Sequence, residues 1–244
     1  MMEKVFAFDV DGTLTKPRQL VNPGFNAFFR EFCVNHPVYL VTGSDRKKLI
    51  EQLPLETVNL CLGAFTCSGA ELWTGDDLTY RKEHEFPPAL LQAAEHFIDT
   101  SPYDQRYGNH IEPRAGMLNI SVVGRNADLI QRKAYSEWDK KHNERRSFVE
   151  ALLKEFPDYE ASTGGQISID IVPNGWTKAV AKLEIETRHP GCAITFFGDK
   201  MGADGNDKPL ADALASEKHH RAIEVRSYLE TWEALKMMEL RKAA

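Results

Sequence analysis

The sequence predicts an α/β protein with a Rossmann-like parallel-sheet core, built from both ends of the chain, and an inserted α+β section. Three observations predict this fold. Short apolar strands alternate with helical patterns over the first 82 residues, as in a sheet of parallel strands. The alternation becomes irregular over residues 83–176 and then resumes. We therefore expect a core formed by residues 1–82 and 177–244, and an inserted cap formed by residues 83–176.

The first strand is expected at residues 5–8, where four consecutive apolar residues suit a strand buried on both faces. Asp9 and Asp11 follow it, and Gly12 and Thr13 then break the strand pattern. In an open parallel sheet, ligands bind beyond the carboxyl ends of the strands. Because the two aspartates are one residue apart, both carboxylates can converge on one cation while the chain stays extended.

Two further strand and helix units complete the first part of the core. A helix begins at Pro23, and its phenylalanines recur at helical spacing, which indicates core packing. A strand at residues 38–41 ends in Thr-Gly-Ser-Asp, and either Ser44 or Asp45 is suited to cap the helix that follows. A third strand is expected at residues 60–65, and a hairpin at residues 69–81.

The inserted section begins with a helix at Pro87 and Pro88 and continues with strands at residues 109–113 and 117–123. A charged helical stretch covers residues 128–156, with a break near Asn143. Two more strands are expected on either side of a glycine pair. These strands are residues 160–163 and 166–172.

The last part of the chain returns to the first pattern. It reads as a helix at residues 178–186, a buried strand at residues 193–197, a further helix, a short strand at residues 222–225 and a final amphipathic helix. The buried strand ends in Gly198 and Asp199, which makes it another strand with an acidic residue at its carboxyl end.

The composition is that of an ordinary globular protein, with 42% hydrophobic and 27% charged residues, which excludes disordered and membrane classes. A formal net charge of −6 disfavours nucleic acid and anionic membranes as partners. The four cysteines are scattered and include no Cys-x-x-Cys, so we expect buried thiols in a reducing compartment. Because no apolar run reaches membrane-span length and no signal-peptide pattern begins the chain, we expect a cytoplasmic protein.

The acidic strand ends together suggest a magnesium site. Gly-Asp after a strand is often only a turn, but a third carboxylate facing Asp9 and Asp11 is what Mg²⁺ favours, together with waters and a substrate phosphate. Asp199 would supply that carboxylate, and Asn206 and Asp207 follow shortly after it.

These residues resemble the signature of the haloacid dehalogenase (HAD) superfamily of phosphotransferases. The resemblance implies that Asp9 is the nucleophile and Asp11 the general acid/base of a two-step phosphoryl transfer. It also implies a phosphate-binding hydroxyl at the end of the second strand, where Thr42 and Ser44 both fit. Lys178 stands where a lysine that neutralises the phosphoaspartate is expected.

The same resemblance implies the metal ligands. Asp9, Asp11 and Asp199 would bind Mg²⁺, and Asn206 with Asp207 would support them.

Longer stretches resemble the eukaryotic-type phosphomannomutase family, in its order and over nearly the whole chain. They are residues 9–18, 116–119 with 124–125, 164–170 with 175–176, and 196–200 with 205–207. The resemblance implies that Ser168 and Asp170 contact sugar hydroxyls. It also implies that four arginines hold the sugar and the phosphate that does not react. These are Arg18, Arg114, Arg125 and Arg132.

The implied enzyme is an isomerase that converts mannose 6-phosphate to mannose 1-phosphate for GDP-mannose synthesis. Mg²⁺ and a hexose 1,6-bisphosphate activator are implied, as is a homodimer formed through the cap. A second, core-stabilising cation is implied near Asp212, although Ala215 stands where a threonine is expected. Two alternatives stay open: a HAD sugar-phosphate phosphatase, which shares the core motifs, and a non-catalytic sugar-phosphate-binding module, which would not need a proton carrier beside Asp9.

Overall fold

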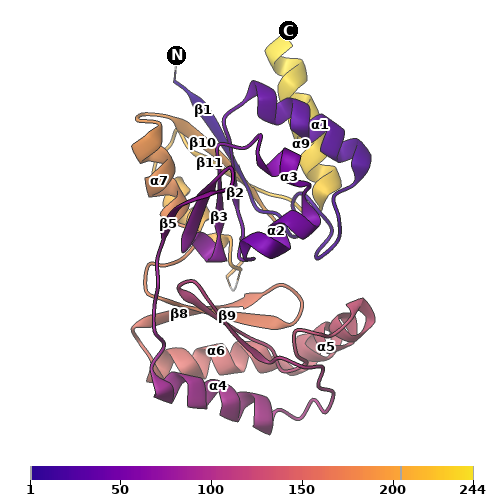
Figure 1. Ribbon diagram of the computed structural model, residues 1–244, viewed down its shortest axis with the longest axis vertical. Coiled ribbons are helices and arrows are strands. Elements are labelled where there is room, and N and C mark those ends of the chain that lie inside the picture. Colours follow the sequence, from indigo (N-terminus) through magenta and orange to yellow (C-terminus); the bar gives the residue numbers. More distant parts are fainter. Residues whose placement is uncertain (1, 204, 244) are drawn as a thin grey trace.

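In the computed structural model, which describes residues 2–203 and 205–243, the chain forms two sheets (Figure 1). The first has seven strands in the order β11-β10-β1-β2-β3-β4-β5, and the second has four in the order β6-β7-β9-β8. We call the first sheet with α1–α3 and α7–α9 the core, and the second sheet with α4–α6 the cap.

The core sheet contains residues from both ends of the chain. Its strands are β1 (Lys4–Phe8), β2 (Val38–Val41), β3 (Gly63–Thr66), β4 (Glu71–Thr74), β5 (Asp77–Arg81), β10 (Ala193–Gly198) and β11 (Arg221–Glu224). β1 pairs in parallel with β2 and with β10, and the parallel pairing extends to β3 and β11. The hairpin of β4 and β5 adds antiparallel strands at one edge. The predicted fold class is therefore confirmed.

Helices cover both faces of the core sheet. They are α1 (Pro23–Asn35), α2 (Arg46–Gln52), α3 (Leu55–Val58), α7 (Val180–Arg188), α8 (Lys208–Ala215) and α9 (Tyr228–Ala243). Phe6 and Phe8 of β1 pack on the side of α1, α2 and α9, whereas Val5 and Ala7 pack on the side of α7 and α8. This alternation is the two-residue period of a strand buried on both faces. The predicted core role of the α1 phenylalanines is confirmed, and all four thiols are buried.

The strand predicted at residues 60–65 is wrong in its start. The strand β3 begins at Gly63, and the short helix α3, which was not predicted, follows Pro54 instead. The reason is the partner strand: β2 begins at Val38, and its Tyr39 pairs with Gly63, so no neighbouring strand extends far enough to pair with Leu60.

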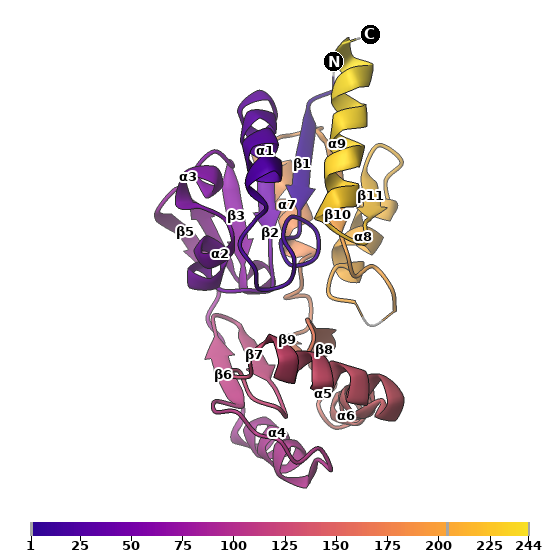
Figure 2. The same ribbon diagram turned by 90° about the vertical axis from the view of Figure 1, so that its right-hand side faces the viewer.

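The cap is an antiparallel sheet with two of its three helices on its outer face. Its elements are α4 (Pro88–Thr100), β6 (Ile111–Arg114), β7 (Met117–Ile120), α5 (Leu129–His142), α6 (Glu144–Glu155), β8 (Tyr159–Gly164) and β9 (Ser168–Pro173). Leu90 and Ala94 of α4 and Leu152 of α6 cover one face of the sheet, and the other face lies toward the core (Figures 1 and 2). Asn143, with φ of 53°, breaks the long helical stretch as predicted.

The carboxyl ends of β1, β2 and β10 all lie at the edge of the core that faces the cap (Figure 2). Both chain termini lie at the opposite end of the core (Figure 1). None of the helices in the described ranges combines the length and apolar character needed to cross a membrane.

Candidate active site

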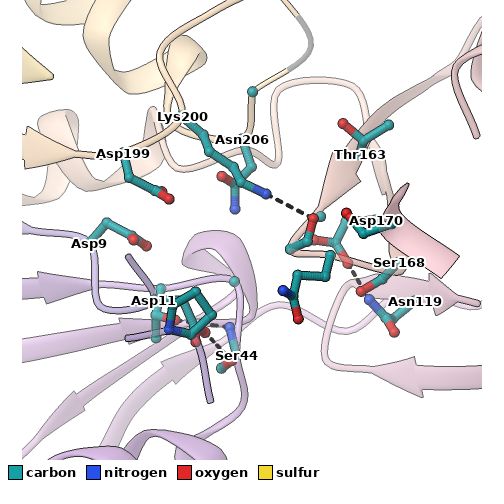
Figure 3. Close-up of a pocket in the computed structure, with 18 of the residues that line it drawn as sticks. Asp9, Asp11, Ser44, Asn119, Thr163, Ser168, Asp170, Asp199, Lys200 and Asn206 are labelled. Atoms are coloured by element: carbon teal, nitrogen blue, oxygen red, sulfur yellow. Dashed lines mark hydrogen bonds between the residues drawn. The ribbon is translucent and has the colours of Figure 1, made fainter. Parts of the chain in front are cut away.

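A cavity of about 610 Å³ lies between the strand ends of the core and the inner face of the cap sheet. Of the predicted site residues, only Lys178, Asp207 and Asp212 do not line it. The predicted residues that do line it are Asp9, Asp11, Arg18, Thr42, Ser44, Arg114, Arg125, Arg132, Ser168, Asp170, Asp199 and Asn206. Residues far apart in the sequence are thus brought to one space (Figure 3).

Asp9 is fixed by a buried lysine. The Lys178 ammonium, which is fully buried, donates to Asp9 Oδ1 at 2.6 Å and to Asp207 Oδ1 at 2.7 Å. Asp207 Oδ2 in turn accepts the backbone N–H groups of Asp199 and Lys200, at 3.1 and 3.0 Å. Lys178 therefore lies beneath the cavity and orients the carboxylate that faces it.

Three carboxylates surround this lysine, and their pKa values reflect it. Burial raises the pKa of Asp9 well above its ordinary value, against the opposing charge of Lys178, and Asp207 and Asp199 raise it further. Burial and the charge of Asp207 raise the pKa of Asp199 to about 6. Burial lowers the pKa of Lys178, but the charges of Asp207 and Asp9 outweigh burial and raise it overall.

This group fits a divalent cation. Ligand oxygens of Asp9, Asp199 and Asp207 lie within 4.8 Å of one another, and hard cations such as Mg²⁺ bind such oxygen sets. The chain is shaped to bring Asp199 close: Gly12 has φ of 93°, and a Cβ there would lie 2.2 Å from Asp199 Oδ2. Only glycine allows this approach.

The five predicted Mg²⁺ ligands differ in their positions relative to this group of three carboxylates. Asp9 and Asp199 line the cavity, with Asn206 beside them. Both oxygens of Asp207 are already hydrogen bonded, so its contribution is to hold Lys178 and the turn after β10. The carboxylate of Asp11 is not part of the group.

Magnesium should stabilise the protein in a pH-dependent way. Because the folded-state pKa of Asp199 is raised to about 6, its stability contribution is present below about pH 4 and lost as pH rises through 6. A bound cation would offset that loss. We expect excess magnesium to raise the melting temperature by roughly 4–8 °C near pH 7.5 and to change it little near pH 4. Thermal unfolding in chelator and in magnesium, with sodium chloride of equal ionic strength as control, measures this. Equal shifts at both pH values would contradict it.

Asp11 is held by hydrogen bonds to residues outside the group of Asp9, Asp199 and Asp207. Its Oδ1 accepts the backbone N–H of Arg18 and the side-chain amide of Gln52, each at 2.8 Å, and Ser44 Oγ lies 3.5 Å from its Oδ2. Gln52 was not predicted, because a glutamine at the end of α2 carries no signal in the sequence.

The loop after β2 presents two hydroxyls to the cavity. Asp45, not Ser44, caps α2, because its side chain accepts the backbone N–H of Lys48 at 2.9 Å. Ser44 Oγ is therefore free to face Asp11. Thr42 Oγ1 accepts the backbone N–H of Ser44 at 3.1 Å, and Thr42 is 1% exposed.

The cap and the loop after β1 bring the four predicted arginines to the cavity. Burial lowers the pKa of Arg125 to about 10, and the like charges of Arg114, Arg18 and Arg132 add to this effect. Burial lowers the pKa of Arg132 to about 10 as well, again with a contribution from Arg18. Such a concentration of buried positive charge favours an anion.

The arginines are anchored to the protein by some of their donors. Arg132 Nε donates to the carbonyl of Ala127 at 2.7 Å, and its Nη2 donates to the carbonyl of Arg125 at 2.5 Å. Arg125 Nη1 donates to Ser168 Oγ at 2.9 Å. Both side chains are therefore held in place at the cavity that they line.

Several lining residues were not assigned from the sequence. Asn119 of β7 donates to Asp170 Oδ1, and Lys200 Nζ donates to the carbonyl of Gly165 in the β8–β9 turn at 3.0 Å (Figure 3). Arg145 donates to the carbonyl of Ser168 at 3.1 Å and pairs with Asp139 at 2.8 Å. Asn119 and Lys200 lie within the motifs used above and could have been found there; Arg145 looked like one charge among many.

Asp212 lies outside the site. It is on α8, largely exposed, and its carboxylate pairs with Lys208 one turn away. In the described parts of the chain, Asp212 belongs to no group of three or more potential metal-ligand side chains. The structure thus adds no support to a second cation there.

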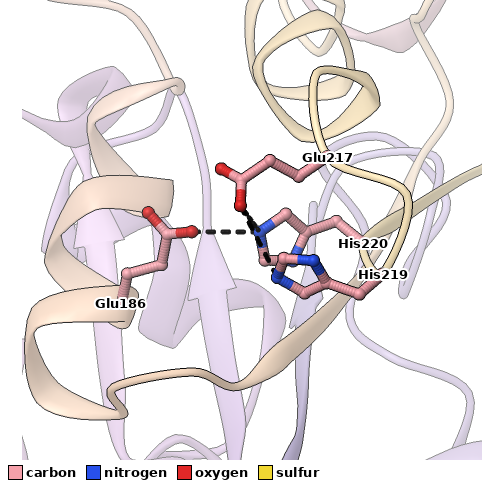
Figure 4. A group of neighbouring side chains, drawn as sticks. All are labelled: Glu186, Glu217, His219 and His220. Atoms are coloured by element: carbon pink, nitrogen blue, oxygen red, sulfur yellow. Dashed lines mark hydrogen bonds and ion pairs between the residues drawn. The ribbon is translucent and has the colours of Figure 1, made fainter.

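Figure 4 shows another group of potential ligands on the core surface, formed by Glu186, Glu217, His219 and His220. Its hydrogen bonds indicate a structural role. His220 Nδ1 accepts the backbone N–H of Ile194 at 3.1 Å, so the proton of the neutral ring is on Nε2, where it donates to Glu186 at 3.0 Å. The Lys182 ammonium lies 3.1 Å from Glu186 and 2.6 Å from Glu217 and offsets part of their charge.

The arrangement of the two lobes is similar to that of known HAD-fold proteins. A sugar phosphatase of HAD subclass IIB superposes with a TM-score of 0.58, at 19% identity, over 97% of this chain and 99% of that one. The C-terminal domain of trehalose-6-phosphate phosphatase from C. albicans superposes with a TM-score of 0.63, at 15% identity, over 93% and 80%. The protein therefore has the HAD fold, and in this chain Asp9 after β1 and Asp199 after β10 line the cavity.

Sequence comparison defines the family. The model of the eukaryotic phosphomannomutase family matches residues 25–220. The phosphomannomutase of Saccharomyces cerevisiae is 35% identical over 214 residues, covering 84% of each chain. A probable phosphomannomutase of Caenorhabditis elegans is 33% identical over 218 residues, covering 84% of this chain and 85% of that one. The chain belongs to the eukaryotic phosphomannomutase family.

Proposed function

We propose that the protein interconverts mannose 6-phosphate and mannose 1-phosphate through a phosphoaspartyl enzyme and a hexose 1,6-bisphosphate intermediate. The observation that carries the proposal is that the four predicted arginines line the same cavity as Asp9. A mutase needs a fixed anion site apart from the nucleophile, because each phosphate of the bisphosphate must be held while the other one reacts. The product would supply GDP-mannose synthesis in the cytoplasm.

Asp9 is the proposed nucleophile. Lys178 holds Oδ1, so the other carboxylate oxygen is the one we expect to attack phosphorus. As the new P–O bond forms, the bond from phosphorus to the sugar oxygen breaks, and Asp11 gives that oxygen a proton. In the second half, Asp11 takes the proton of the attacking sugar hydroxyl and the Asp9–phosphorus bond breaks.

The other core residues bind and orient the transferring group. We assign the phosphate-binding hydroxyl to Ser44, since Thr42 is turned to the backbone of Ser44 and Asp45 supplies the helix cap. Asp9, Asp199 and Asn206 would hold Mg²⁺, with Asp207 as their support. Magnesium, when bound, would neutralise charge on the phosphoryl oxygens.

The cap residues would bind the rest of the substrate. We infer that Arg125 and Arg132 hold the distal phosphate, together with Arg18 and Arg114, because all four line the cavity. Ser168 and Asp170 would contact sugar hydroxyls.

The proposal extends to the organisation of the protein. We place the core–cap boundaries at residues 82/83 and 176/177, and we propose a homodimer formed through the cap.

A product assay separates this function from its alternatives. Purified protein is incubated with mannose 1-phosphate, magnesium and a labelled hexose 1,6-bisphosphate. A mutase yields mannose 6-phosphate with the label on a sugar. Label recovered mainly as inorganic phosphate would instead indicate a sugar-phosphate phosphatase, and binding of the sugar phosphate without any transfer would indicate a binding module.

Arg132→Ala should impair the mutase reaction in particular. Loss of one charge-assisted contact to the distal phosphate should lower interconversion by roughly ten- to a hundredfold. It should also raise the share of phosphate released to water, because a loosely held intermediate escapes before it reorients. Hexose phosphate and inorganic phosphate are measured in the same reaction. Lys133→Ala is the matched control, since this neighbour on α5 is exposed. Unchanged rates and an unchanged ratio in Arg132→Ala and Arg125→Ala would remove the anion site from the proposal.

A further inference from the structure

One carboxylate of the cap joins the core to two arginines of the cavity. Glu112 belongs to β6, a strand that lies below α2 in the view of Figure 2. Its Oε1 accepts from Lys48 Nζ of α2 at 2.6 Å. Its Oε2 accepts from Arg114 Nη2 at 2.8 Å and lies 3.2 Å from Arg125 Nε. Glu112 itself does not line the cavity.

The ion pairs that Glu112 forms with Lys48, Arg114 and Arg125 make up a network that is largely shielded from solvent. The side chains of Glu112 and Lys48 are 24% and 17% exposed, and those of Arg114 and Arg125 only 6% and 10%. Burial raises the pKa of Glu112, but hydrogen bonds and charges from Arg114 and Lys48 outweigh burial and lower it to about 2. Glu112 is therefore ionised at neutral pH, and its ion pairs are screened less by salt than exposed ones.

Arg114 and Arg125 each donate a second hydrogen bond, in both cases to a part of the chain that carries a proposed substrate-binding residue. Arg114 Nη1 donates to the carbonyl of Gly43 at 3.0 Å, in the loop that carries Ser44. Arg125 Nη1 donates to Ser168 Oγ at 2.9 Å. With Glu112 as the additional contact, the planes of both guanidinium groups are set, and so are the directions of their remaining donors.

Lys48 can reach Glu112 only when the cap lies against the core, because the two residues belong to different lobes. We propose that Glu112 is a positioning residue that couples closure of the cap, through Lys48, to the alignment of Arg114 and Arg125 on the sugar phosphate. This inference rests on the proposed function. In the closed arrangement the carboxylate fixes both arginines, and without Lys48 it would be free to turn away from them.

A simpler role for Glu112, charge neutralisation alone, predicts a different result. Removing its negative charge beside the arginines would then strengthen anion binding, so KM would fall and kcat would not change. A positioning role predicts a lower kcat, since alignment matters most in the transition state. It also predicts more phosphate lost to water, since the intermediate is held less firmly.

The test compares Glu112→Gln, Lys48→Met and the double variant. Glutamine keeps the size of the side chain and removes its charge. Interconversion of mannose 1-phosphate with hexose 1,6-bisphosphate gives kcat and KM, and inorganic phosphate is measured in the same reaction. We expect kcat to fall about tenfold in Glu112→Gln and about threefold in Lys48→Met, with a larger phosphate share in both. Since Lys48 acts through Glu112, Lys48→Met should lower kcat by less than about twofold in the Glu112→Gln background.

Three matched variants complete the test. Lys48→Arg, which keeps the charge, should restore kcat to within about twofold of the parent. Lys47→Met on α2 and Glu95→Gln on α4 change exposed residues and should behave as the parent does. The inference is overturned if both single variants keep the parent kcat, if Glu112→Gln changes KM alone, or if Lys48→Met lowers kcat equally in both backgrounds. If the parent itself does not interconvert mannose phosphates, the proposed function fails instead.

Discussion

Asp9→Asn is expected to form no phosphoenzyme and to show no interconversion of hexose phosphates, yet to be at least as stable as the parent. The amide has nearly the shape of the carboxylate but is a poor nucleophile, so the first covalent step is lost. Residual activity should fall below that of any other single substitution in the site.

The stability of the same variant follows from the charges around Lys178. Three carboxylates, those of Asp9, Asp199 and Asp207, surround one ammonium group, and burial together with the other two carboxylates raises the pKa of Asp9. The amide of the Asp9→Asn variant would resemble the protonated carboxyl that this environment favours. Lys178 keeps Asp207 as its partner at 2.7 Å. Without a divalent cation, we expect an unchanged melting temperature or a rise of roughly 2–5 °C near pH 7.5.

Two measurements decide this prediction. Protein incubated with bisphosphate labelled in its phosphates should carry label in the parent and none in Asp9→Asn. Thermal unfolding in chelator gives the difference in stability. Label on the variant would move the nucleophile elsewhere, and a clear loss of stability would show that the attraction to Lys178 outweighs the repulsion among the carboxylates.

The strand ends of the site could be predicted because their signals are local. An apolar run followed by Asp9 and Asp11, or by Gly198 and Asp199, places carboxylates at the edge of a parallel sheet wherever the helices lie. The break at Asn143 was predictable for the same reason.

Long-range pairings could not be predicted, because nothing near them in the sequence specifies the partner. Glu112 and Lys48 are 64 residues apart, and each alone looks like a solvated charge. The strand at residues 60–65 was misplaced for a related reason: its start depends on where β2 begins. Asp45 and Ser44 were equally suited to cap α2, and only the folded loop shows that Asp45 does so.

Lys178→Met should reduce both activity and stability severely. The ammonium is fully buried and donates to Asp9 and Asp207 at 2.6 and 2.7 Å. Removing one partner of a buried ion pair leaves uncompensated charge and typically costs about 3–5 kcal/mol. Because Asp9 would also lose its orientation, we expect interconversion to fall by a factor of at least about 10³.

Lys182→Met is the matched control for this substitution. Lys182 lies one turn further along and pairs with Glu186 and with Glu217, whose side chain is 43% exposed at the surface of the core. Such a pair contributes little, so we expect a loss below about 1 kcal/mol and unchanged activity.

The pH dependence shows whether stranded carboxylates cause the loss in Lys178→Met. The pKa of Lys178 is raised above its ordinary value, so in the parent its contribution is present throughout the range from about pH 4 to about pH 9. In the variant, the carboxylates would be protonated near pH 4 and charged near pH 8, so the destabilisation should grow as pH rises. Adding Asp207→Asn should recover part of the stability, since it removes one stranded charge, but none of the activity. Denaturant unfolding at both pH values measures this, and a loss independent of pH and of Asp207 would assign Lys178 a packing role instead.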